Sequence, residues 1–465
     1  MPRDSSNPFN KPPSNVGKEI KRMTIQVDPV PNTPELPEHV DVAVIGGGII
    51  GVCSAYELAR KGARVALFEK GVIAGEQSGR NWGWCRQQNR SMFELPMAMH
   101  ALRRWGELGD ETGEDTGFRR EGIVYTTTRA EDIDKWRAWE AGAREHGFIS
   151  HILDGDEAQA KSPGTTTDWL GGLFSPDDGR AEPAKAAPAI ARGLVKLGGH
   201  VFQNCAVRGL DIDNGQVRGV VTERGRVRAD KVIGAGGAWS GRMCRRHGIG
   251  LPVTNVIGTA FTTTAAPEVT PGCLTTPTVA MRRRLDGGYT LAVPGRGRID
   301  LAPLGMRYAT KFYAAYQRKL KKKLTYRLGK PFFSGPEALG SWSLDGISPF
   351  EKQRILDPKP DAGLARDTLA ACQREYPALA DMAMDELWAG AIDTTPDMIP
   401  IISPVSSLPG FMVASGFSGH GFGIGPGAGR LIADMAAGDE PIVDPSPYRL
   451  DRFYDGTKLK QPELM

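Results

Sequence analysis

The sequence predicts an α/β protein in which a domain of parallel strands and helices is interleaved with an α+β domain built on a large mixed sheet. Three observations favour this fold. Residues 40–69 read as a buried strand, a glycine-rich turn, a helix and a second buried strand. Residues 252–308 are rich in short strand patterns, and a second glycine-rich turn at 415–429 leads into a C-terminal helix. With 465 residues the chain is long for one core and sufficient for two.

The first strand, turn and helix have the spacing of a dinucleotide-binding turn. The run Val40–Ile45 is apolar except for Asp41, as in a strand that is buried on both faces, and Gly46, Gly48 and Gly51 follow it. Such glycines permit a tight turn, close approach of a pyrophosphate to the backbone, and close packing of the helix on the strand. The N-terminus of the helix then offers free N–H groups to the phosphates.

Glu69 indicates the kind of nucleotide. It lies 18 residues after Gly51, at the end of the second strand, where a carboxylate can accept hydrogen bonds from both ribose hydroxyls. Because a carboxylate disfavours a 2′-phosphate, the expected ligand is FAD or NAD rather than NADP. Three later segments can reach the pyrophosphate and a flavin ring and therefore favour FAD: residues 75–83, 235–239 and 416–423. The third opens a helix, whose positive end would stabilise an anionic reduced ring.

The middle of the chain alternates between helical and strand patterns. Residues 99–175 read as helices around a short strand, and a further helix is expected at 183–197. The Asn214–Gly215 pair is a hairpin signal between two strands. The run KVIGA at 231–235 is another buried strand that ends in glycines.

Composition excludes several classes of protein. Hydrophobic residues make up 40% and charged residues 24%, so wholesale disorder is excluded. The six cysteines form no CxxC pair, which argues against a zinc site and a disulfide framework, and we expect no metal. No apolar run is long enough to span a membrane, and residues 1–13 lack the apolar core of a secretory signal. These features predict a cytoplasmic protein.

At the motifs described above the sequence resembles the D-amino-acid-oxidase-like flavoprotein superfamily. This group includes glycine and sarcosine oxidases, D-amino-acid dehydrogenases and enzymes of the iminodiacetate oxidase type. The resemblance covers residues 40 to 440 approximately, and its matching stretches are VIGGGIIGVCSAYELARKGARVALFEKG, SGRNWGW, DGRAEPAKAAPAIARG, GAGGAWS, TTPDMIPII and GFSGHGFGIGPGAGRLIADM. It implies a Rossmann-like FAD-binding domain interleaved with a substrate domain whose large mixed sheet covers the flavin.

The same resemblance implies a division of the chain. Residues 1–38 are polar and proline-rich and are expected to form an extended arm. The expected FAD-binding domain comprises 39–98, 176–250 and 385–445. The expected substrate domain comprises 99–175 and 251–384, and 446–465 form a C-terminal tail.

Two positions depart from the pattern of the relatives. Sarcosine oxidases link their flavin to a cysteine at the position of Gly390, and Cys372 is too far upstream to replace it, so noncovalent FAD is expected. Glycine oxidase holds the substrate carboxylate with an arginine where this chain has Ile392. A carboxylate-binding cation must therefore come from another part of the chain.

The residues expected to contact the cofactor come from the glycine-rich turn, from the segment after Glu69 and from the two later glycine-rich segments. Trp82 and Trp84 are candidates to line the flavin site, although one of them is expected to be an ordinary core residue. The full set is Gly46, Gly48, Ile49, Ile50, Gly51, Glu69, Lys70, Gln77, Ser78, Arg80, Asn81, Trp82, Gly83, Trp84, Val207, Gly236, Trp239, Gly419, His420, Gly421, Phe422 and Gly423.

Four residues are candidates to act on the substrate. Arg86 follows the SGRNWGW motif and is expected beside the flavin, where it would bind a carboxylate. Arg282 and Arg284 alternate on one strand and share a face, which makes them further candidate clamps, and the alternative is a solvated strand. His420 is a candidate base, and the alternative is that it contributes backbone and shape between glycines.

The expected function is oxidation of a secondary amine or amino acid, of the iminodiacetate or sarcosine type or a D-amino acid. FAD accepts a hydride from the carbon beside the nitrogen, and water hydrolyses the resulting imine. The alternatives are an NAD-linked dehydrogenase, which the C-terminal glycine-rich block disfavours, and a flavin-bearing scaffold or assembly protein without turnover. Oxygen and a respiratory quinone both remain candidate electron acceptors.

Residues 311–330 hold the positive charge of the chain. They contain eight basic residues and no acidic one, while the net charge of the whole sequence is only +4. Phe312, Tyr316, Leu320, Leu324 and Leu328 recur every four residues and predict a basic amphipathic helix over 309–330. The helix would pack on its own domain or lie on an anionic membrane surface and serve a quinone or other electron acceptor. No nucleic-acid partner is expected, because the rest of the chain is net acidic.

Overall fold

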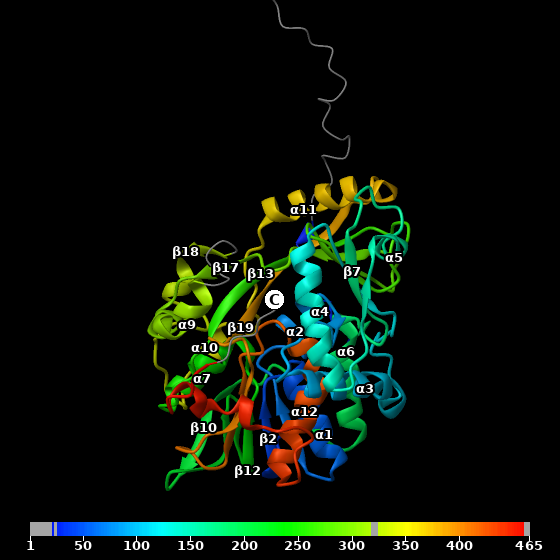
Figure 1. The fold of residues 1–465 in the computed structure, drawn as a ribbon. Coiled ribbons are helices and arrows are strands. Elements are labelled where there is room, and N and C mark those ends of the chain that lie inside the picture. The colour runs from blue at the N-terminus through cyan, green and yellow to red at the C-terminus, as the bar shows by residue number, and fades with distance from the viewer. Residues whose placement is uncertain (1–20, 23–25, 318–323, 460–465) are drawn as a thin grey trace, which may run out of the picture.

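The computed structural model describes residues 21–22, 26–317 and 324–459, the first pair by its backbone. Its two large sheets lie one above the other in Figure 1, with the smaller sheet in the lower half. The chain passes repeatedly between them, so each sheet is assembled from segments that are far apart in the sequence. This agrees with the expected mixed α/β fold, while the domain boundaries themselves stay a prediction.

The smaller sheet contains the βαβ unit that the sequence predicts. Strands β2 (His39–Ile45) and β3 (Val65–Phe68) pair in parallel, and all four residues of β3 are buried. A sheet covered on both faces requires such apolar strands. Its strand order is β10 (Val207–Asp213), β11 (Gln216–Thr222), β12 (Gly225–Gly234), β2, β3 and β9 (His200–Phe202), with β21 (Phe411–Ser415) beside β12 and β20 (Ile401–Pro404) beside β21.

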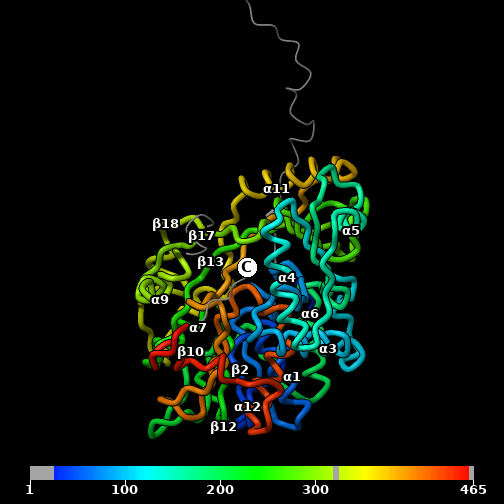
Figure 2. Tube along the Cα trace, in the orientation of Figure 1, coloured from blue at the N-terminus to red at the C-terminus, as the bar shows by residue number. Residues whose placement is uncertain are grey.

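Helices from both ends of the chain pack together on the smaller sheet. The helices α1 (Ile49–Arg60) and α12 (Gly421–Ala437) lie side by side, blue and orange in Figure 2. They approach closely at Gly429, where an added Cβ would lie 2.5 Å from the Cβ of Cys53. Two further helices, α3 (Leu95–Thr112) and α6 (Pro183–Lys196), complete this layer.

The larger sheet has eleven strands in mixed orientation. Its longest pair is β13 (Thr254–Thr263) and β19 (Met384–Thr394), which run antiparallel, and Thr394 forms an isolated bridge with Phe417, which follows β21 of the smaller sheet. Helix α11 (Ala362–Glu375) packs against this region. The strand order is β1 (Lys21–Arg22), β19, β13, β16 (Tyr289–Ala292), β15 (Ala280–Arg283), β14 (Cys273–Thr275), β5 (Ile123–Thr127), β7 (Gly171–Ser175) and β6 (His151–Leu153).

Shorter elements connect the two sheets and flank them. The ones used below are α2 (Gln77–Arg80), β4 (Trp84–Cys85), β8 (Gly179–Arg180), the 3₁₀ turn Gly237–Trp239, α7 (Ser240–Arg246), α8 (Pro303–Arg307), α9 (Ala309–Ala315) and α10 (Pro349–Lys352). Two more helices, α4 (Ala130–Glu145) and α5 (Gly155–Lys161), pack against the β6–β7 end of the larger sheet.

The prediction of one helix over residues 309–330 is wrong. Helix α9 ends at Ala315, and Leu324–Arg327 form strand β18, which pairs in parallel with β17 (Gly297–Asp300). The pairing with β17 is non-local and supplies backbone hydrogen bonds that a pattern of apolar residues cannot reveal. Leu324 is buried and Leu328 is exposed, so the expected stripe does not share one face. The basic cluster at 318–323 lies outside the described residues.

Two further features differ from the expected division of the chain or refine it. Strand β19 belongs to the larger sheet, although residues 385–445 were assigned to the FAD-binding domain. Residues 26–38 form neither helix nor strand, yet Val30 is buried against the core below α6. No helix in the described part of the chain combines the length and the apolar character needed to cross a membrane.

All six cysteines are buried and unpaired. Burial is the largest cause that raises the pKa of each of these thiols, and at Cys53 the nearby Glu57 raises it further. The cysteines therefore act as small apolar core residues.

Candidate active site

A long cavity runs from the turn between β2 and α1 to the first turn of α12, and we call it the flavin cavity. It passes Glu69 at the end of β3, the 3₁₀ turn after β12, and the last residues of β19. The expected cofactor residues that line it are Gly46, Gly48, Ile49, Ile50, Glu69, Lys70, Gln77, Ser78, Asn81, Val207, Gly236, Trp239, Gly419, Gly421 and Phe422.

The glycines of the first turn have different tasks. Gly46 has a φ of +110°, and a Cβ there would lie 2.3 Å from the carbonyl oxygen of Ala235. A Cβ on Gly51 would lie 2.0 Å from the carbonyl oxygen of Gly46. These two glycines allow the backbone to pack. A Cβ on Gly48 would meet only the Ser78 hydroxyl, at 3.1 Å, so Gly48 leaves the cavity side of the turn open.

The Glu69 carboxylate is held in place by backbone amides. Its Oε2 accepts a hydrogen bond from the N–H of Gly47 and its Oε1 accepts one from the N–H of Gly71, both at 2.7 Å. Burial raises the pKa of Glu69, while Lys70 and the two amides act in the opposite direction. An ionised carboxylate has about four acceptor sites, so two remain for ribose hydroxyls.

Lys70 supports the cavity wall and does not reach freely into the cavity. Its ammonium forms an ion pair with Glu76 and donates to the carbonyl oxygen of Arg354 at 2.7 Å. It also lies 4.8 Å from the centroid of the Trp239 ring, whose Nε1 donates to Glu76 at 3.2 Å. Glu76 lies within the segment predicted from sequence, yet its role was missed, because its partners come from distant parts of the chain.

Asp393 positions the flavin end of the cavity, and sequence reasoning missed it. Its carboxylate accepts hydrogen bonds from the hydroxyl of Ser415 at 3.0 Å and from the N–H of Gly416. Its own carbonyl oxygen accepts from the N–H of Ser418 at 2.9 Å. Burial raises the pKa of Asp393, and the turn amides counteract this shift. The residue thereby fixes the turn that leads into α12.

Seven of the expected cofactor residues do not line this cavity. Arg80 is buried and pairs with Asp357 at 2.8 Å, and Trp82 packs in a small apolar cluster with Trp388. Trp84 lies beside Trp82, with ring centroids 6.2 Å apart, so both tryptophans belong to the packing around the loop. The complete group is Gly51, Arg80, Trp82, Gly83, Trp84, His420 and Gly423.

His420 is the N-cap of α12 and is buried beside Glu94. Its Nδ1 lies 3.1 Å from Oε1 of Glu94. Burial lowers the pKa of His420 to about 4, and the charges of Arg90 and Arg86 act in the same direction. An imidazole with so low a pKa is a poor proton acceptor near neutral pH, which disfavours His420 as a catalytic base.

Arg86 lies against the first turn of α12, where a Cβ on Gly423 would be 3.2 Å from its backbone nitrogen. Nη1 donates to the carbonyl oxygen of Gln88 at 2.7 Å and to the hydroxyl of Tyr125 at 2.9 Å. Among the described residues, none accepts a hydrogen bond from its Nε or Nη2. These two donors are suited to bind a carboxylate in a bidentate manner.

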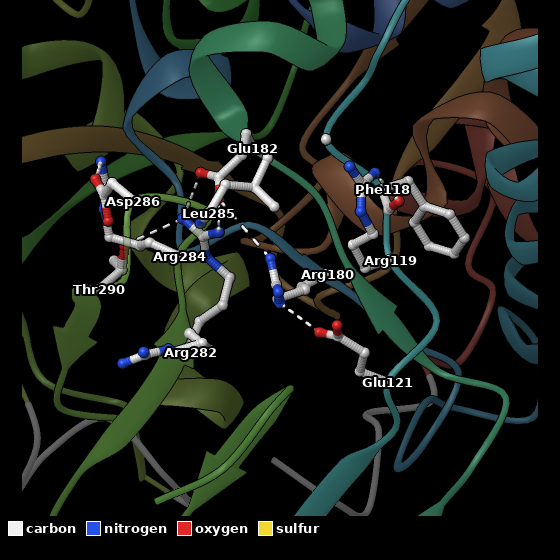
Figure 3. Close-up of polar contacts among 12 residues, drawn as sticks. Phe118, Arg119, Glu121, Arg180, Glu182, Arg282, Arg284, Leu285, Asp286 and Thr290 are labelled. Atoms are coloured by element: carbon white, nitrogen blue, oxygen red, sulfur yellow. Dashed lines mark hydrogen bonds and ion pairs between the residues drawn. The ribbon is translucent and has the colours of Figure 1, made fainter. Parts of the chain in front are cut away.

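In the structure, Arg282 and Arg284 each form an ion pair with an acidic residue of the protein itself. Arg282 is fully buried, and its guanidinium donates to both carboxylate oxygens of Glu182, at 2.8 and 3.1 Å (Figure 3). Arg284 pairs with Asp286 on the same turn. The expectation that these arginines bind a substrate carboxylate is therefore corrected, because their charges are already compensated.

Comparison with known proteins agrees with this arrangement. The profile of the family described as "FAD dependent oxidoreductase" matches residues 41–435, which is most of the chain. The chain belongs to this family. The cofactor of the flavin cavity is accordingly FAD.

Three relatives illustrate the range of the family. The chain is 28% identical to glycine oxidase of Pseudomonas aeruginosa over 88% of this chain and 97% of the relative. It is 24% identical to the mitochondrial dimethylglycine dehydrogenase of Rattus norvegicus over 89% of this chain, and spans about half the length of that relative, 45%. An L-amino acid deaminase from Proteus myxofaciens, solved with anthranilate, has a similar structure, with a TM-score of 0.88 and 29% identity over 94% of this chain and 98% of the other.

The residues of the cavity fit FAD. A Cβ on Gly237 would meet nothing within 4 Å, and one on Gly419 would meet only Ile392 at 3.8 Å, so the backbone leaves open space along the cavity. The Oε1 atom of Gln77, which lines the cavity, is buried and has no hydrogen-bond partner among the described residues. A bound cofactor supplies the groups that such an atom lacks.

FAD is bound noncovalently, and the surroundings of Gly390 explain why. A Cβ at this position would lie 2.0 Å from Oε1 of Gln77. The Gln77 amide therefore fills the space that a linking cysteine side chain would need.

We expect Gly48→Val to abolish FAD binding without unfolding the chain. The branched side chain would enter the space that the pyrophosphate requires, but within the protein its Cβ meets only the Ser78 hydroxyl. The purified variant should be colourless, with native circular dichroism and a lower Tm, because bound FAD no longer stabilises it.

The matched control is Gly106→Ala, on the exposed side of α3, where the nearest atom to an added Cβ is 3.4 Å away. This control should bind FAD stoichiometrically. A Gly48→Val protein with one FAD per chain would contradict the assignment of the turn.

Proposed function

We propose that the chain oxidises an amino acid or secondary amine at the carbon beside its nitrogen. The observation that carries the proposal is the position of Arg86. It lies against the first turn of α12, whose residues Gly421 and Phe422 line the flavin cavity, and it keeps two unused donors. A carboxylate bound there would place the rest of the substrate beside the flavin end of the cavity.

FAD, when bound, supplies the two-electron oxidant by accepting a hydride from the α-carbon of the substrate. The substrate leaves this step as an imine, and water hydrolyses it to the carbonyl product and an amine. The task of the chain is to orient the C–H bond and to exclude water. Desolvation lowers the pKa of the substrate amine, so that the nitrogen is neutral and no dedicated base is required. The N-terminus of α12 contributes a positive dipole near the flavin ring.

The range of substrates follows from what the relatives share. Glycine, dimethylglycine and L-amino acids appear in their names, and each compound carries a carboxylate beside the amine-bearing carbon. Sarcosine-like compounds, iminodiacetate and D-amino acids have the same arrangement. The preference for a diacid such as iminodiacetate loses support, because Arg282 and Arg284 are paired within the protein.

The proposal is tested by adding candidate substrates to the yellow protein without oxygen. We expect at least one amino acid or secondary amine, from a panel that includes both enantiomers, to bleach the long-wavelength flavin band. Free FAD with the same compounds is the control. A scaffold in which FAD is structural predicts no bleaching by any member of the panel.

We expect Arg86→Ala to lower kcat/KM by roughly 10- to 150-fold while FAD content is retained. A charge-assisted hydrogen bond contributes about 1.5–3 kcal/mol, and Arg86 does not line the flavin cavity. The matched control is Arg103→Ala on the exposed side of α3, which should leave kcat/KM unchanged. Equal kinetics of the Arg86 variant and the wild type would remove Arg86 as the carboxylate-binding residue.

We also propose that, within the segment 306–347, the described residues 306–317 and 324–347 form a surface that docks on an anionic membrane and serves a quinone or other membrane-bound acceptor. Among the residues that the structure describes, seven of the 14 exposed large hydrophobic ones lie in this segment, and Leu328 and Phe333 are 68% and 82% exposed. The segment also contains the eight basic residues and no acid between 311 and 330. Exposed apolar side chains in a stretch of sequence rich in basic residues suit the surface of anionic lipid.

We expect the wild type to co-sediment with phosphatidylglycerol vesicles at low salt and less at high salt, and the double variant Leu328→Asp/Phe333→Asp to stay in solution. Ile149→Asp, at a residue 61% exposed on another part of the surface, is the control and should sediment like the wild type. Equal sedimentation of the double variant and the wild type would exclude this surface.

A further inference from the structure

A second cavity lies between the larger sheet and helices α8 and α9, and we call it the aromatic chamber. It encloses about 450 Å³, which is within the range of small-molecule sites. Strands β13 and β19 form one wall, and Phe312, Tyr316 and Tyr326 belong to the opposite side. None of the described residues that line it carries a charge.

The aromatic chamber and the flavin cavity both have lining residues on the β13–β19 pair. Val256 lies opposite Ile392, and Thr254 lies opposite Thr394. Cross-strand partners and alternate residues share a face of a sheet, so these four side chains lie together. Thr254, Val256 and Thr394 line the chamber, whereas Ile392 lines the flavin cavity. Two residues along a strand span about 7 Å, so Ile392 separates two neighbouring spaces.

We propose that the aromatic chamber receives the side chain of the substrate, and that the enzyme therefore selects amino acids with a large apolar or aromatic group. This inference rests on the proposed function, because it assumes that the substrate is bound by its carboxylate near Arg86. The α-carbon would lie at the flavin end of the cavity, and the side chain would extend past Ile392 along the sheet. Transfer of a phenyl group into such a site favours the aromatic substrate by roughly 10- to 150-fold.

The chemistry of the chamber disfavours charged side chains. A second substrate carboxylate would lose its hydration and find no cation among the lining residues that the structure describes. It would also approach Glu337, whose buried Oε1 has no hydrogen-bond partner within the described residues. That oxygen lies 2.9 Å from the position of a Cβ on Gly305, a residue that lines the chamber. Among the described residues, the chamber thus offers a better site to an apolar ring than to a second carboxylate.

The test compares phenylalanine with alanine, using the enantiomer that is turned over, in the FAD-loaded wild type and in Val256→Phe. The variant places a ring in the chamber on a strand that tolerates aromatic residues. We expect the wild type to show at least a 10-fold higher kcat/KM for phenylalanine. Val256→Phe should lower the value for phenylalanine at least 10-fold and the value for alanine less than about threefold. Gln216→Phe places the same ring at an exposed position of strand β11, outside the chamber and the proposed docking surface, and should behave like the wild type.

A binding measurement separates this inference from the proposed function. Phenylacetate and acetate are titrated into the same three proteins, and binding is followed by the change in flavin absorbance. We expect phenylacetate to bind the wild type at least 10-fold more tightly than acetate, and this difference to disappear in Val256→Phe.

Each contrary result has its own meaning. Equal affinity for the two acids, or equal effects of Val256→Phe on phenylalanine and alanine, would overturn the role of the chamber. An effect of Val256→Phe confined to the rate with a quinone acceptor would also overturn it, because the chamber would then serve the acceptor. If no amine bleaches the flavin, the proposed function fails, and the titration with phenylacetate still decides what the chamber binds.

Discussion

The carboxylate of Asp393 is the contact on which the active site depends most directly. It stands near the end of β19, a strand of the larger sheet, and accepts hydrogen bonds from the turn that leads from the smaller sheet into α12. The neighbouring Thr394 pairs with Phe417 of the same turn. One partly buried side chain thus connects the two sheets at the point where both contribute to the flavin cavity. The hydrogen bonds of Asp393 therefore set the position of the N-terminus of α12 relative to Ile392 and Thr394.

The parts of the fold that are coded locally could be predicted from the sequence. The strand, the glycines and Glu69 of the first βαβ unit follow one another within thirty residues or so, and each has a local pattern. Contacts between distant segments could not be predicted. The sequence predicts that Arg282 and Arg284 alternate on a strand. It does not predict their acidic partners, because Glu182 lies 100 residues away from Arg282. Likewise, apolar residues recur every four positions from Phe312, as they would in a helix. The pairing of β18 with β17 nevertheless makes residues 324–327 a strand.

The distribution of charge narrows the choice of substrate-binding residue. Three buried arginines near the two sheets are balanced by carboxylates: Arg282 by Glu182, Arg80 by Asp357 and Arg452 by Asp397. Removing one partner from such a pair is costly, because the remaining charge is buried without compensation. These ion pairs therefore stabilise the fold. Arg86 differs, since its two described partners are a carbonyl oxygen and a tyrosine hydroxyl, and neither neutralises it.

The burial of all six thiols has a consequence for an enzyme that passes electrons to oxygen. Hydrogen peroxide would then form beside the flavin, and the thiolate is the form of cysteine that peroxide attacks. Cys85 adjoins the loop of Arg86, yet burial keeps the pKa of this thiol well above its ordinary value. Burial likewise raises the pKa of the neighbouring Cys273 and that of Cys53. An enzyme with this arrangement of thiols would resist oxidation by peroxide formed during its own turnover.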